Sequence, residues 1–281
     1  MSLIVDGGPG FQWCMDNLPA TPATVGPGTT FSSGASNADG AVSAVLAALT
    51  YEAQYIVIKT GIDNTAGEDN SCLADIMFDP AGGTAWVEGI SDLIVGSSQV
   101  AAAGALSGPE YHFNLRIAAG TSIGIQCRKT GATADTGARI AMWVYGQPLR
   151  PWLWKAGQAV ESLGIDAANS KGTAHTPGAT GTYSAYATIG TSTRRYCGLQ
   201  VGVQMSGGTT IARAYHGQIG ISDARMPGTG TFAWEATTAE LGNRCQPGLI
   251  LADVPSGTAL QFRATSSGTA DAVNVAYYGV Y

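Results

Sequence analysis

An internal repeat constrains the possible fold of this chain more than any other feature of its sequence. Residues 117–128 (IAAGTSIGIQCR) resemble residues 254–265 (VPSGTALQFRAT) near the end of the chain. Both segments place two alternating apolar residues at the same spacing after a glycine, which matches Gly120 with Gly257, Ile123 with Leu260, and Ile125 with Phe262. A repeat of this kind indicates that one structural unit occurs twice, so the fold of one half predicts the fold of the other.

The repeat continues on both sides of these segments. Each copy closes with an apolar run that ends in Tyr-Gly, at residues 145–146 and 278–279. Upstream the match is looser, and it pairs residues 55–58 with 196–203 and residues 75–78 with 218–221. Between the copies, Pro148 and Pro151 favour an extended connector. We therefore expect a first copy at residues 1–149 and a second copy at residues 150–281.

The apolar runs within each copy are short, alternate in places, and are separated by clusters of Gly, Pro, Asn and Asp. This pattern is typical of short strands joined by tight turns. It predicts an all-β protein made of two tandem jelly-roll-like antiparallel β-sandwich domains.

Two segments also fit a helix. Residues 41–50 are rich in alanine, but their counterpart at residues 183–190 contains Tyr and Thr, so we expect a strand. For residues 232–241 the sequence predicts a short helical turn or an ordinary surface loop.

Charge and hydropathy exclude several classes of function. The net charge is −6 and the pI is about 4.9, and the longest basic runs are the pairs Arg128-Lys129 and Arg194-Arg195, so we expect no nucleic-acid binding. No apolar stretch reaches the roughly 20 residues of a membrane helix, and residues 1–10 lack the features of a secretory signal. We therefore expect a soluble protein that is not inserted into a membrane.

The charge is divided unevenly between the copies. The first copy contains 5 Lys or Arg and 13 Asp or Glu, a net of −8, whereas the second contains 9 and 7, a net of +2. Opposite signs would help copies to stack in an assembly. Drift of exposed loops explains the difference equally well.

The cysteines and histidines suggest no metal or redox site. The five cysteines are widely spaced, contain no C-x-x-C pair, and cannot all pair within the chain, so free and mostly buried thiols are expected. The three histidines do not cluster, and no phosphate loop or dinucleotide motif occurs. We expect no metal and no cofactor.

Two motifs resemble functional sites. Gly-x-Ser-x-Gly around Ser122 is the local signature of a hydrolase nucleophile, but it precedes a strand, and the second copy has Ala259 in place of the serine. The acidic loop at residues 63–70 lacks the ligand spacing of an EF-hand, so a solvated hairpin loop is expected. The sequence therefore predicts no catalytic, cofactor-binding or metal-binding residues.

Aromatic side chains could form a sugar-binding platform, because Tyr and Trp present flat amphipathic faces. The candidates are Trp13, Trp86, Trp152, Trp154, Tyr183, Tyr186 and Trp234. For each residue taken singly, a place in the core or an interface is the stronger expectation, and Trp152 and Trp154 are expected at the junction between the copies.

Several motifs resemble those of virion surface proteins of tailed bacteriophages. They are WVYGQP at residues 143–148, DPAGG at 79–83, TRR at 193–195, and AYYG at 276–279. The resemblance covers nearly the whole chain, but its motifs preserve the fold and transfer no catalytic residue.

The resemblance implies a non-enzymatic structural component exposed on a phage particle, as a capsid decoration protein, a head fibre or spike, or a tail-associated subunit. Such a protein is made in the host cytoplasm and is expected on the virion as a homotrimer or other symmetric oligomer, in contact with other virion proteins. Residues 1–17 are then either an arm that anchors the subunit to the shell or the first strand of the first copy.

Two alternatives remain open. The first is a receptor-binding or glycan-binding lectin-like module of a phage fibre, which would hold host surface glycans with loop aromatics. The second is an enzyme such as a glycan depolymerase or an esterase, in which Ser122 would be the nucleophile.

Overall fold

A computed structural model describes residues 11, 13–18, 28–64, 70–98, 108–130, 136–148, 155–205, 213–236, 241–245, 248–268 and 272–281. Within these residues every regular element is a β-strand, and every strand pairing is antiparallel. The predicted fold class, two tandem β-sandwiches, is confirmed. No helix in this part of the chain has the length and hydrophobicity required to cross a membrane.

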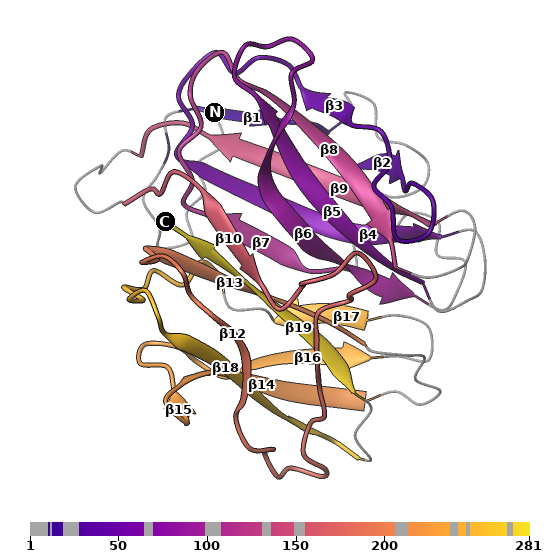
Figure 1. Cartoon of the computed structure of the whole chain (residues 1–281), viewed down its shortest axis with the longest axis vertical. Helices are drawn as coiled ribbons and strands as arrows, with labels where there is room; N and C mark the ends of the chain where they lie inside the picture. The colour runs from indigo at the N-terminus through magenta and orange to yellow at the C-terminus, as the bar shows by residue number, and fades with distance from the viewer. Residues whose placement is uncertain are drawn as a thin grey trace.

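Strands β1–β9 make up the first copy and form two sheets (Figure 1). One sheet contains β1 (Cys14–Asp16), β9 (Thr136–Tyr145), β4 (Tyr55–Asn64) and β7 (Glu110–Phe113) in that order, with β2 (Thr29–Ser32) also paired to β9. The other contains β3 (Ser43–Leu46), β8 (Ser122–Lys129), β5 (Asn70–Asp79) and β6 (Val87–Ser98).

Strands β10–β19 make up the second copy, which lies below the first in Figure 1. One sheet contains β10 (Val160–Leu163), β19 (Val273–Val280) and β11 (Thr173–His175), with β13 (Gly198–Met205) also paired to β19. The other contains β12 (Ala187–Thr191), β18 (Ala259–Ser266), β14 (Arg213–Ile221), β16 (Phe232–Ala236) and β17 (Leu241–Cys245), with β15 (Ala224–Arg225) paired to β14.

Strand pairing reproduces the sequence repeat. In the first copy β8 lies between β3 and β5, and in the second copy β18 lies between β12 and β14. The matched positions are in register, because Ile125 lies opposite Ile76 and Phe262 lies opposite Ile219. Likewise, β9 pairs with β1 and β4 as β19 pairs with β10 and β13. Among the residues that the structure describes, 14–16 are therefore the first strand of the first copy.

The two helix-like segments are strands. Residues 41–50 contain β3, as expected. The helical turn or loop predicted for residues 232–241 is wrong, because this segment contains β16 and the start of β17. The reason is the period of burial: Phe232 and Trp234 are buried in the core of the second copy while Glu235 is exposed.

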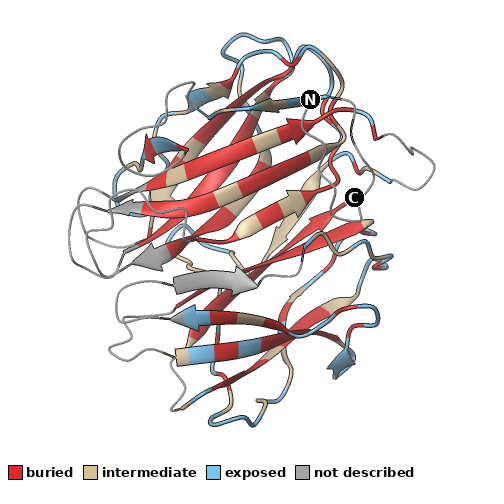
Figure 2. Cartoon of the chain, turned by 180° about the vertical axis from the view of Figure 1, so that it is seen from behind, coloured by how far each residue is buried: buried red, intermediate tan, exposed pale blue. Residues whose placement is uncertain are grey.

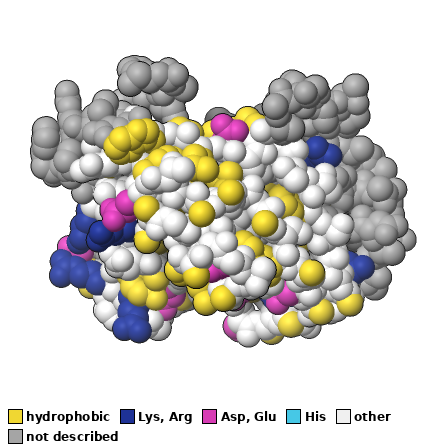
Figure 3. Space-filling model, turned by 90° about the horizontal axis from the view of Figure 1, so that it is seen from above, with side chains coloured by type: hydrophobic (Ala, Val, Ile, Leu, Met, Phe, Trp, Pro, Cys, Tyr) yellow, Lys and Arg dark blue, Asp and Glu magenta, His cyan; other side chains and the backbone are white. Residues whose placement is uncertain are grey.

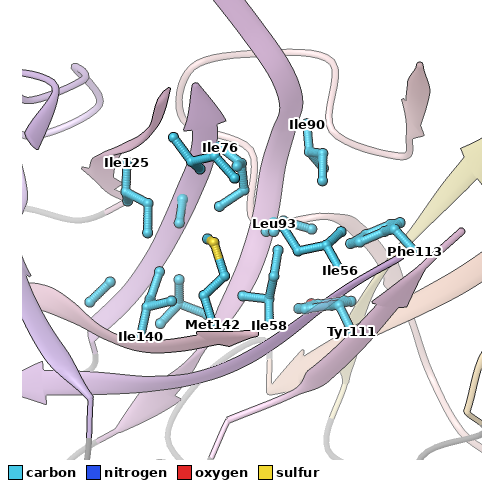
Figure 4. Packing of buried hydrophobic residues seen from close by; sticks show 14 of the residues in the cluster. Ile56, Ile58, Ile76, Ile90, Leu93, Tyr111, Phe113, Ile125, Ile140 and Met142 are labelled. Atoms are coloured by element: carbon cyan, nitrogen blue, oxygen red, sulfur yellow. The ribbon is translucent and has the colours of Figure 1, made fainter. Parts of the chain in front are cut away.

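The core of the first copy lies between its two sheets. Figure 4 shows Ile56 and Ile58 of β4 facing Ile76 of β5 and Leu93 of β6. Cys72 and Cys127 lie in the same core as free thiols. In Figure 2 the buried residues follow the long strands of both copies, and the exposed residues gather in the turns.

Strand β19 contributes to both cores. Val273, Val275 and Tyr277 lie in the core of the second copy. Ala276, Tyr278 and Val280 alternate with them and lie in the core of the first. The connector at residues 149–154 lies outside the described residues, so the boundary near residue 150 stays a proposal.

Candidate functional site

A β-bulge interrupts the pairing of β5 with β6. Ala74 pairs with Leu93, and Ile76 pairs with Ile90, so Asp75 alone faces both Ser91 and Asp92. Asp92 has a φ of 57°, in the left-handed region that residues other than glycine rarely occupy. Bulges redirect side chains and occur often beside active sites, and strained backbone of this kind gathers at functional sites. The Ser91–Asp92 bulge is therefore the starting point for a candidate site.

The bulge holds the buried carboxylate of Asp75. The backbone N–H of Asp92 donates to Asp75 Oδ1 at 2.6 Å, and Gln126 Nε2 donates to Asp75 Oδ2 at 3.0 Å. Gln126 lies directly opposite Asp75 on β8, so both side chains lie on the same face of the sheet. Burial raises the pKa of Asp75, while these two hydrogen bonds act to lower it. Because both of its oxygens are bonded, Asp75 is held in one orientation.

Asp92 places a second carboxylate beside the first. Its side chain is 20% exposed and forms an ion pair with Arg128, whose guanidinium also contacts Asp39 at 3.0 Å. The pKa of Asp92 is raised to about 6: burial raises it most, Arg128 lowers it, and the negative charge of Asp75 contributes to the rise. Asp92 therefore changes its protonation state near neutral pH, as a general acid or base must.

An aromatic ring lies on the same face of the sheet. Along β8, Ile123, Ile125 and Cys127 point into the core, and the alternating Gly124, Gln126 and Arg128 lie on the outer face. The Trp86 ring packs against Gly124, with ring atoms 3.0 and 3.1 Å from the position that a β-carbon would take there. Trp86 is half-buried. The outer face thus carries, in order, an aromatic ring, the Asp75–Gln126 pair and Arg128.

The second copy has no acid at the equivalent position. Gln218 of β14 takes the place of Asp75 and lies opposite Arg263 of β18. Arg263 donates from Nε and Nη2 to Gln218 Oε1, at 3.0 and 2.8 Å. The guanidinium also lies over the rings of Tyr183 and Tyr186, at 4.8 and 4.5 Å from their centres. The repeat therefore keeps a polar pair at this place, and the carboxylates belong to the first copy.

Ser122 lacks the surroundings of a hydrolase nucleophile. It is buried at the start of β8, opposite Asp79. Of the histidines, His112 bonds Tyr55 and Glu110, and His175 bonds Ser184. No hydrogen bond joins Ser122 to a histidine among the residues that the structure describes.

The acidic loop at residues 63–70 offers no test of calcium binding, because residues 65–69 and the side chains beside them lie outside the described residues. In the described part of the chain, no group of three His, Cys, Asp or Glu residues is arranged to hold a metal ion.

The aromatic candidates have different surroundings. Trp234 is buried and stacks on Tyr215 with ring centres 5.2 Å apart, so it is a core residue. Trp13 is 51% exposed and stacks on Tyr51 at 5.8 Å. Trp152 and Trp154 lie outside the described residues. Trp86 is the candidate that lies on the same face as the two carboxylates.

Charges of both signs share the molecular surface. On the face shown in Figure 3, basic side chains lie next to acidic ones at one edge, and hydrophobic side chains are spread in small groups. The expectation that the protein does not bind nucleic acid is untested and stays a prediction.

Comparison with known proteins gives only distant structural similarities. The chain matches no protein-family model and no curated protein sequence. It is similar to PNGase F, a glycosylasparaginase from Flavobacterium meningosepticum, with 12% identity and a TM-score of 0.35 over 95% of each chain. It is also similar to the CBM22-1–CBM22-2 tandem domain of Paenibacillus barcinonensis Xyn10C, with 12% identity and a TM-score of 0.27 over 95% of this chain and 91% of that one.

A further similarity is to the major capsid protein P2 of bacteriophage PM2, with 7% identity and a TM-score of 0.28 over 90% of this chain and 97% of that one. This similarity does not confirm a phage virion protein. The predicted virion location, the oligomeric state and the partners are untested and stay predictions.

The predictions of a non-enzymatic virion component and of no enzymatic activity are contradicted. The structures of PNGase F, an enzyme, match nearly the whole chain, and the lectin-like alternative gains no support. The resemblance misled because its motifs are turns and strand ends, which different functions share. At this level of similarity no activity passes from PNGase F to this chain, so its function has to be argued from its own residues.

Proposed function

We propose that this chain is a hydrolase acting on a carbohydrate-containing substrate, with Asp92 as the general acid. The observation that carries the proposal is the Ser91–Asp92 bulge, which brings two carboxyl groups and a guanidinium together on one face of a sheet. Strained backbone, a carboxyl that titrates near neutral pH, and a specific charged partner together favour catalysis over a purely structural role.

Each residue of the site has a distinct part in the proposed reaction. Protonated Asp92 gives its proton to the leaving group as the bond to that group breaks and a water molecule bonds to the carbon left behind. The proton that the water loses then returns Asp92 to its acid form. Asp75 keeps Asp92 in place through the backbone N–H of Asp92, and its negative charge favours the protonated form of Asp92. Arg128 stabilises the Asp92 carboxylate that remains after proton transfer.

The substrate class follows from the side chains on the same face of the sheet as the acid. Trp86 presents an aromatic ring on the same face, and such rings commonly stack against sugars. Gln126 and Arg128 add hydrogen-bond donors, which hydroxyl and amide groups of a glycan accept.

The first substrate to test is a peptide carrying N-acetyl-β-D-glucosaminyl asparagine, the group in the name of one of the similar structures. It offers a sugar ring to Trp86 and a leaving nitrogen that can take the proton of Asp92. Nitrophenyl glycosides form the second part of the panel. With purified protein, we expect hydrolysis that falls as the pH rises above about 6, because Asp92 loses its acid form.

Asp92→Asn should lower the rate by about 100-fold or more, because asparagine has no proton to give. Asp223→Asn is the matched control: Asp223 also has a φ of 57°, but it belongs to the second copy and bonds Gln261. The control should keep full activity, and so should Ser122→Ala. An Asp92→Asn protein as active as the wild type, or a wild type inactive on the whole panel, would rule out this proposal.

A further inference from the structure

The second copy contacts the bulge through two hydroxyl groups. Ser162 Oγ donates to the carbonyl of Ser91 at 2.7 Å, and Tyr278 Oη donates to the carbonyl of Asp92 at 2.8 Å. Ser162 and Tyr278 lie directly opposite each other in the β10–β19 pairing. Two facing residues of one copy thus bind two consecutive carbonyls of the other, and we call this pair the hydroxyl clamp.

The phenol of Tyr278 is itself held in place. Tyr278 is fully buried, and its oxygen also accepts a hydrogen bond from the backbone N–H of Ile94 at 2.9 Å. Tyr111 donates to the carbonyl of Ile94 at 2.7 Å, and its ring meets the Tyr278 ring edge to face at 5.3 Å. The position of this hydroxyl is therefore fixed by contacts on both sides.

The bulge needs such support because of its backbone conformation. A residue other than glycine in the left-handed region persists only where its surroundings determine that conformation. The carbonyl of Asp92 is held by Tyr278, and its N–H is held by Asp75, so both polar backbone groups of this residue are bonded. Without Tyr278, one of these two backbone restraints is lost, so the bulge can shift and expose more of Asp92 to solvent, while its N–H bond to Asp75 and its ion pair with Arg128 remain.

We propose that the second copy completes the site of the first, with Ser162 and Tyr278 acting as positioning residues for Asp92. The catalytic consequence rests on the proposed function, but the positioning itself is measurable without any substrate. It also gives the repeat a function: the second copy supplies the support, and the first copy carries the acid.

The first test is a carbon-13 NMR titration of the full-length protein, with the Asp92 carboxyl assigned by its loss in Asp92→Asn. The charged groups that face Asp92 are Arg128, Asp75 and Glu88, with Asp39 on the far side of Arg128. In Tyr278→Phe, Asp92 gains solvent, so its pKa should fall from about 6 toward the ordinary value of an aspartate. Ser162→Ala should shift it in the same direction by less.

Tyr277→Phe is the matched control. Tyr277 is the neighbouring tyrosine on β19, is fully buried, and donates to the carbonyl of Gln261 at 2.8 Å inside the second copy. It should leave the Asp92 titration unchanged. If Tyr278→Phe does not fold, Ser162→Ala decides the test. A folded clamp variant whose Asp92 titrates as in the wild type would overturn the inference.

Activity separates this inference from the proposed function. With a substrate in hand, Tyr278→Phe should lower kcat by about 10- to 100-fold and move the pH profile to lower pH, while Tyr277→Phe changes neither. If the wild type hydrolyses nothing but the Asp92 titration shifts in the clamp variants, the proposed function fails and the positioning stands.

Discussion

At the scale of single residues, Asp92 combines features that are rarely found in one side chain. Its φ is 57°, it is mostly buried, and its carboxyl pairs with Arg128 and interacts electrostatically with the buried Asp75. Asp223 in the second copy has the same backbone conformation, but it is exposed and bonds the neutral Gln261. The two aspartates thus share a backbone conformation, and they differ in burial and in the charge of their neighbours.

The raised pKa of Asp92 makes stability depend on pH. The unfolded chain ionises Asp92 near its ordinary pKa of 3.8, whereas the folded protein does so near 6. The stabilising contribution of Asp92 is therefore complete below about pH 4 and is lost as the pH rises through 6. Relative to Asp92→Asn, the wild type should lose about 2 to 3 kcal/mol of unfolding free energy between pH 4 and 7. Urea unfolding of both proteins across this range tests the prediction, which parallel pH profiles would contradict.

At the scale of elements, the Tyr-Gly ending of β19 has a packing explanation. Gly279 pairs with Glu161 of β10 on one side and with Leu199 of β13 on the other. A β-carbon at Gly279 would lie 2.3 to 2.4 Å from atoms of the Tyr196 ring. The glycine therefore lets the Tyr196 ring approach the strand closely, which gives the motif a packing role.

Gly279→Ala should destabilise the protein by about 1 to 3 kcal/mol, because the buried Tyr196 ring and the strand have to move apart. Gly230→Ala is the control, since Gly230 is exposed and a β-carbon there would meet nothing within 4 Å. The midpoint of chemical denaturation measures both effects. Equal midpoints for the two variants would show that this close approach does not matter.

At the scale of the whole molecule, the two sandwiches share β19. One face of this strand fills the core of the second copy, and the other face fills the core of the first. An interface made of core residues differs from the polar contacts that let domains move independently. The hydroxyl clamp lies at this junction, so the candidate site depends on the two copies remaining together.

We expect the two copies to unfold as one unit. Calorimetry of the whole chain should show a single transition whose van't Hoff and calorimetric enthalpies agree. Gly279→Ala, a change in the second copy, should move that transition without splitting it. Two separate transitions in the wild type would contradict the idea that β19 joins the two cores into one cooperative unit.

The repeat and the strands could be predicted from sequence because both depend on local patterns. Alternating apolar residues and turn residues are local features of the sequence, so the β-sandwich fold followed from the pattern. A first strand within residues 1–17 was one of the two alternatives that the pattern left open, and β1 lies there. The same reasoning was wrong for residues 232–241, for which it predicted a short helical turn or an ordinary surface loop. There, long-range pairing of β16 with β14 decided the outcome.

The candidate site was decided by tertiary structure alone. The residue types near positions 91 and 92 do not predict a bulge. No local sequence pattern places Asp75 next to Asp92, or Tyr278 next to the Asp92 carbonyl, which is 186 residues away in the chain. The sequence offered two hints: Trp86 was among the candidates for a sugar-binding platform, and Asp75 stands where the second copy has Gln218. A carboxyl acquires its acidity from the burial and the charges around it, and these exist only once distant strands have come together.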